Sequence, residues 1–64
     1  MKNVKGFYQQ GYELSMLTSG KMFHVMLKKD EVLLDRTTFT EFEASTDYFD
    51  TIVHYLTTEV IKEK

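Results

Sequence analysis

The chain has 64 residues, enough for one domain, and it contains neither cysteine nor proline. The absence of cysteine excludes disulfide bonds and zinc sites built on thiolates. Ten Asp and Glu residues against eight Lys and Arg residues give a net charge of −2, a sign that argues mildly against binding to phosphate backbones. Hydrophobic residues make up 42% of the chain, which is typical of a folded domain.

The start of the chain carries Lys2 and Lys5 with no apolar stretch after them, so we expect no secretory signal. No apolar run approaches the ~18 residues that a membrane span needs. These two observations lead us to expect a cytoplasmic protein.

The first ten residues give only weak signals, and Phe7 and Tyr8 fit either a short edge strand or a loose arm. From residue 11 to 17, apolar Tyr12, Leu14 and Met16 alternate with polar residues. This period of two predicts a strand with one buried face.

A second strand is expected over residues 22–28, after a turn at 18–21 in which Gly20 can adopt a positive φ. Residues 28–31 form a charged second turn. A third strand then covers residues 32–35 and extends as far as 38 in the longer version. The sequence therefore predicts an antiparallel β-meander over residues 11–38.

A helix is expected over residues 41–61. Thr40 as N-cap and Glu43 three residues later fit a capping box. One narrow apolar stripe at helical spacing must face the sheet. Its members are Phe42, Phe49, Val53, Leu56 and Val60.

The β propensity of residues 37–40 leaves an alternative open, in which residues 37–42 form a fourth short strand and the helix begins after Ser45. In either version the fold class is α+β. We expect a small two-layer domain whose three-stranded, or four-stranded, antiparallel meander packs on one C-terminal amphipathic helix.

Two apolar surfaces exceed what this architecture buries. On the helix, Ile52, Tyr48 and Tyr55 widen the apolar arc on one flank. Either the sheet curls around that flank, or Tyr48 and Tyr55 contact a second chain, a position in which tyrosine is favoured.

On the sheet, Met22, His24 and Met26 face away from the helix if Phe23 and its alternate neighbours face it, and Leu17 and Leu33 are expected to join them. Either the N-terminal segment folds over this patch, or the patch is an interface with a partner. The residues predicted to bind a partner are Met22, His24, Met26, Leu33, Tyr48 and Tyr55.

No catalytic signature is present, and we expect no enzyme activity, no cofactor, no metal and no small-molecule substrate. Asp50 and His54 stand four residues apart, the spacing of a surface pair on a helix and, less commonly, of a base or two metal ligands.

The expected function is that of a small regulatory or protein-interaction module that pairs with itself, for example an accessory or inhibitor protein of a phage or mobile element. The alternative is a protein that binds single-stranded nucleic acid through aromatic residues of the sheet and lysines of the hairpins. These residues are Phe7, Tyr8, Tyr12, Phe23, Lys21, Lys28 and Lys29.

Overall fold

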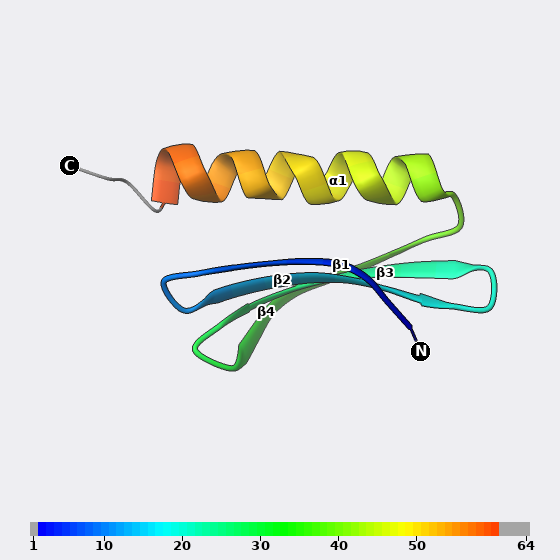
Figure 1. Ribbon diagram of the computed structural model, residues 1–64, viewed down its shortest axis with the longest axis horizontal. Helices are drawn as coiled ribbons and strands as arrows, with labels where there is room; N and C mark the ends of the chain where they lie inside the picture. The colour runs from blue at the N-terminus through cyan, green and yellow to red at the C-terminus, as the bar shows by residue number, and fades with distance from the viewer. Residues whose placement is uncertain (1, 61–64) are drawn as a thin grey trace.

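A computed structural model describes residues 2–60 and shows a four-stranded antiparallel sheet covered on one face by a helix (Figure 1). The strands follow one another along the chain and across the sheet in the same order. Their bounds are β1 (Lys2–Gln9), β2 (Tyr12–Ser19), β3 (Met22–Lys29) and β4 (Val32–Phe39), followed by α1 (Phe42–Tyr55) and a π-helical turn, η1 (Leu56–Val60). The α+β meander with one C-terminal helix is therefore confirmed.

Each pair of strands is joined by a two-residue loop whose backbone matches the right-handed twist of the sheet. Gln10 and Gly11 both have positive φ, as do Asp30 and Glu31, which is the pattern of a type I′ turn. In the middle loop only Gly20 has a positive φ, at 62°, as in a type II′ turn. These tight loops fix the register of all four strands.

The N-terminal segment is an edge strand of the sheet, so the alternative of a loose arm is wrong. β1 pairs with β2 along its length, and the register shifts between Asn3 and Lys5, where Val4 is the extra residue of a bulge. Phe7 packs against the core. The fourth strand thus comes from the start of the chain.

Both predictions for the junction between β4 and the helix are wrong in detail. Phe39 is opposite Phe23 and ends β4, so no strand runs on to residue 42. The N-cap is Glu41, which makes no side-chain capping bond, and Thr40 is not part of a capping box. The backbone N–H of Ser45 donates to the carbonyl of Glu41 at 3.2 Å, so the first helical turn has formed before Ser45.

The core lies between α1 and the β2–β3 centre of the sheet. Its buried apolar members are Leu14, Met16, Val25, Phe49 and Leu56. Phe42, expected in the same apolar stripe, is 51% exposed but contacts Phe23 edge to face, with ring centroids 5.7 Å apart. The side chain of Val60 and the expected end of the helix at residue 61 lie outside the described residues.

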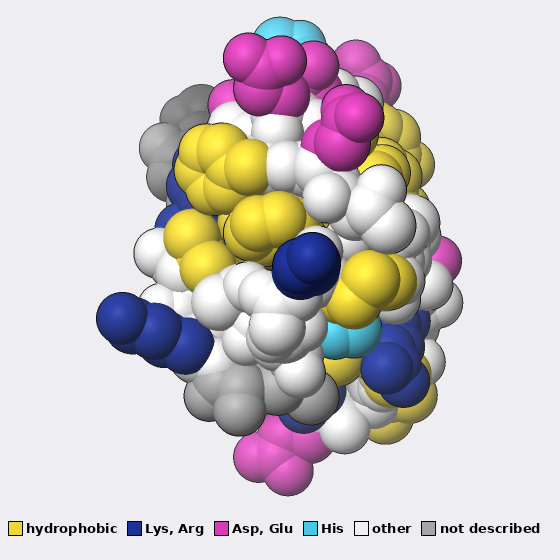
Figure 2. All heavy atoms as spheres, turned by 90° about the vertical axis from the view of Figure 1, so that its right-hand side faces the viewer, with side chains coloured by type: hydrophobic (Ala, Val, Ile, Leu, Met, Phe, Trp, Pro, Cys, Tyr) yellow, Lys and Arg dark blue, Asp and Glu magenta, His cyan; other side chains and the backbone are white. Residues whose placement is uncertain are grey.

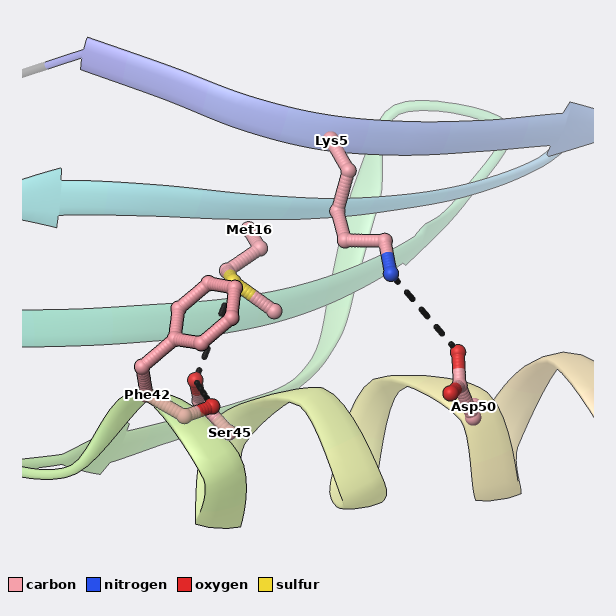
Figure 3. A network of polar contacts seen from close by, with 5 residues as sticks. All are labelled: Lys5, Met16, Phe42, Ser45 and Asp50. Carbon is pink, nitrogen blue, oxygen red and sulfur yellow. Dashed lines mark hydrogen bonds and ion pairs between the residues drawn. The ribbon is translucent and has the colours of Figure 1, made fainter.

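Polar contacts also attach the helix to the sheet (Figure 3). The hydroxyl of buried Ser45 donates to the carbonyl of Phe42 at 2.7 Å and lies 3.7 Å from the sulfur of Met16. Lys5 crosses from β1 to Asp50, with N and O 3.8 Å apart, and its ammonium lies 5.0 Å from the centre of the Phe49 ring. The helix is therefore positioned over one face of the sheet from β1 to β4.

Candidate partner-binding surface

The face of the sheet opposite α1 is uncovered along the part of the chain that the structure describes (Figure 1). Because side chains alternate along a strand, those between the core residues project away from the helix. We call this the open face. It consists of Asn3, Gly6, Tyr8, Glu13, Ser15, Leu17, Ser19, Met22, His24, Met26, Lys28, Leu33, Arg36 and Thr38.

Four of the six residues predicted to bind a partner meet on the open face. Met22, His24 and Met26 come from β3, and Leu33 lies opposite Lys28 on β4. The alternative in which the N-terminal segment folds over them is wrong, because that segment is β1 and lies beside β2. Met26 is half-buried, while Met22 and Leu33 are 37% and 51% exposed.

Residues that are opposite one another on the four strands form a row across the open face. In the middle row, the side chains change from small on β1 and β2 to large on β3 and β4. The strand register places Gly6 beside Ser15, Ser15 beside Met26, and Met26 beside Arg36. Over β1 and β2 this leaves an open hollow of about 480 Å³, bordered by Asn3, Gly6, Tyr8, Glu13 and Ser15 with Phe7 and Leu14 beneath. We call β1 and β2 the hollow half of the open face, and β3 and β4 the raised half.

The next row contains both charge signs between two apolar ends. Tyr8 lies beside Glu13, Glu13 beside Lys28, and Lys28 beside Leu33. Tyr8 is 72% exposed, so its ring is available to a partner. In this row Glu13 gives the hollow half a negative charge, and Lys28 gives the raised half a positive charge.

The helix surface differs from the sheet in charge. Its described residues carry Glu43, Asp47, Asp50 and Glu59 and include no Lys or Arg. Figure 2 shows acidic side chains gathered at the top, over the helix, while the Lys and Arg side chains lie lower, at the level of the sheet. On the open face, by contrast, the basic side chains are Lys28 and Arg36, and both are on the raised half.

The two tyrosines of the helix have different surroundings. Tyr48 packs on Phe39, with ring centroids 5.4 Å apart, and its hydroxyl donates to Asp35 and accepts from Thr37. The hydrogen bond to Asp35 raises the pKa of Tyr48, with smaller contributions from burial and from the charge of Asp35, while the bond from Thr37 lowers it. Tyr48 is thus engaged by its own sheet, which curls around that flank, whereas Tyr55 is 56% exposed.

Sequence reasoning did not assign Gly6, Tyr8 or Arg36 to the partner-binding surface. Gly6 and Tyr8 alternate with Phe7, so a strand through the first ten residues puts them on one face. The signal was weak because Gly6 has low β propensity and the surrounding residues are mostly polar. Arg36 was missed because its face depends on the register shift between Leu27 and Lys28, which moves β4 by one residue.

The described residues hold no cluster of the kind that binds a metal ion. Among residues 2–60 no group of three or more His, Cys, Asp or Glu side chains converges. Asp50 forms an ion pair with Lys5 of β1, and the ion pairs of the described residues do not include one between Asp50 and His54, so the expected surface pair on the helix is wrong. Two of the aromatic residues proposed for stacking on bases, Phe7 and Phe23, pack against the core under the helix.

Comparison with protein-family models, with curated protein sequences and with solved structures finds no match to this chain. Within residues 2–60, no helix has the length and apolar character that crossing a bilayer demands.

Proposed function

We propose that this domain is a small non-enzymatic interaction module that works by burying its open face against a protein partner. The observation that supports this most is the uncovered sheet face, which carries Met22, Met26, Leu17 and Leu33 together with the exposed ring of Tyr8. A sheet with one face on a helix and the other in water normally has polar residues on the outer face. Apolar side chains there favour contact with a partner.

The residue types on this face suit protein recognition. Met22 and Met26 have flexible, polarisable side chains that adapt to an opposing surface. Tyr8 and Arg36 belong to the residue types enriched where binding energy concentrates. A short chain also gains from association, because a single core of this size rarely supplies more than ~3–5 kcal/mol. A cytoplasmic setting and a regulatory role are part of this proposal.

Affinity capture from the native host tests the proposal. Tagged wild-type protein is compared with Met26→Glu, which places a charge in the middle of the open face, and with Thr51→Glu, which places the same charge on the exposed outer side of α1. We expect a protein held by the wild type and by Thr51→Glu to be lost with Met26→Glu. Equal capture by all three folded proteins would contradict a role for the open face.

Binding of single-stranded nucleic acid is a second candidate, favoured by Lys28 and Arg36 on β3 and β4 of the open face and by the exposed ring of Tyr8 on β1 of the same face. A fluorescent oligonucleotide titrated at low salt tests it, because the phosphate contribution is strongest there. Binding that weakens steeply with added salt and with Arg36→Ala would support it, and no binding at low salt would exclude it.

A further inference from the structure

We propose that the partner of the open face is a second copy of this chain, stacked face to face about a two-fold axis that runs along the strands between β2 and β3. This inference rests on the proposed use of the open face for protein binding. An axis in this place sets β1 on the partner's β4 and β2 on the partner's β3. The hollow half of each copy then receives the raised half of the other, and the same contacts form twice.

The middle row fits this arrangement by size. Gly6 and Ser15 on the hollow half meet the partner's Arg36 and Met26, respectively, so the two smallest side chains of the row face the two largest. The hollow of about 480 Å³ beside Gly6 provides the space. Sheets that stack with nearly aligned strands interdigitate their side chains in this way.

The adjacent row fits by charge and polarity. Glu13 meets the partner's Lys28, and Tyr8 meets the partner's Leu33. No pair of like charges is brought together in either row. Complementary charges at both ends of a two-fold contact favour one register and disfavour a slipped one.

The size of the face limits the strength of the dimer. Four strands about 4.8 Å apart and eight residues long at ~3.3 Å per residue present roughly 500 Å² per copy. Two such faces bury about 1,000 Å², which lies at the lower limit for a specific interface. We therefore expect a dimer that dissociates on dilution, and sedimentation over a range of concentrations is the appropriate measurement.

A mixing experiment with two charge variants tests the orientation. In the Glu13→Lys variant, positions 13 and 28 are both basic. In the Lys28→Glu variant, both positions are acidic. Each variant alone should dimerise about tenfold more weakly than the wild type, because like charges then meet across the interface. An equimolar mixture should recover the dimer, because opposite charges face each other in the mixed pair.

The mixture separates contacts between chains from contacts within one chain. Glu13 and Lys28 are also neighbours in the same sheet, and this neighbour pair stays like-charged in both variants when they are mixed. Recovery of the dimer therefore reports the contact between copies. Thr51→Lys, on the exposed outer side of α1, is the matched control and should sediment as the wild type does.

A second variant keeps the test valid if a charge variant fails to fold. Gly6→Gln fills the hollow, and the fold should tolerate it, because a Cβ at this position meets only the carbonyl oxygen of Leu14, at an ordinary 3.7 Å. We expect it to stay folded by circular dichroism and to dimerise at least about tenfold more weakly.

Two outcomes would overturn the inference. A wild-type chain that stays monomeric at near-millimolar concentration has no self-association of this kind. A wild-type dimer that survives Gly6→Gln, or is not recovered by mixing the charge variants, uses another surface or orientation. Either result leaves the proposed function to be judged by the capture experiment, which does not depend on self-association.

Discussion

The two faces of the sheet are built from the same four strands, yet the helix closes only one of them. On the covered face, Leu14, Met16 and Val25 are at most 1% exposed. On the open face, Leu17 and Met26 alternate with them along the same strands and remain half-buried. The difference shows that strand alternation alone does not decide burial, because burial requires a second layer.

The largest expected effect compares one leucine from each face. Leu14→Ala removes a fully buried side chain and should lower the free energy of unfolding by about 2–5 kcal/mol. Leu17→Ala, on the open face, should cost less than about half as much, because water already reaches that side chain. Urea denaturation measures both values, at a dilution where the chain is monomeric. Equal losses under that condition would show that Leu17 is as inaccessible to water as Leu14 within a single chain.

An intermediate effect on stability is expected from substituting Gly11, in the turn between β1 and β2, compared with Gly6 in β1. Gly11 has a φ of 86°, and an added Cβ would lie 2.6 Å from Oδ1 of Asp30. Gly11→Ala should therefore destabilise the protein by about 1–2 kcal/mol, since an L-residue is strained in this region. Gly6→Ala adds the same methyl group without a clash and should leave the midpoint of thermal unfolding nearly unchanged. A loss at Gly6 as large as that at Gly11 would contradict the described strand β1.

The smallest effect concerns Tyr48, which ties the flank of the helix to the covered face. Its pKa is raised in the folded protein above the ordinary value of about 10, so the neutral form is preferred there. The resulting stabilisation is present below pH ~10 and is lost as the pH rises through the folded-state pKa. Tyr48→Phe should remove this part of the pH dependence, which thermal melts between neutral and alkaline pH measure. An unchanged dependence would show that the Asp35 bond does not form.

The alternation of Tyr12, Leu14 and Met16 and the apolar stripe of the helix were sufficient to predict the meander and its terminal helix. Both rest on periodic burial of large apolar residues, the strongest signal in a single sequence. The junction at residues 40–45 was wrong because the capping pattern at Thr40 is local. Phe39, opposite Phe23, is the last residue of β4, and a sequence pattern does not show where this pairing stops.

Only part of the candidate surface was predictable, because a sequence pattern shows alternation within one strand but not the pairing between strands. Met22, His24 and Met26 follow from alternation within one strand. Gly6 and Arg36 reach the same row only through three registers, and the irregularity between Leu27 and Lys28 decides which face Arg36 occupies. A single sequence carries little information about such pairings, since they depend on turns and bulges elsewhere in the chain.

The free edge of β4 has a consequence for how these molecules behave when crowded. Val32, Leu33 and Leu34 are each more than half exposed at the start of this strand, beside backbone groups that no neighbouring strand pairs within residues 2–60. Such an edge is a template for chain-upon-chain sheet growth. An antiparallel match centred on Arg36 would set two guanidinium groups against each other, and the irregular register beside Leu27 interrupts a flat match further along. Arg36, which we propose to fill the hollow of a second copy, is therefore also expected to hinder the growth of fibres from this edge.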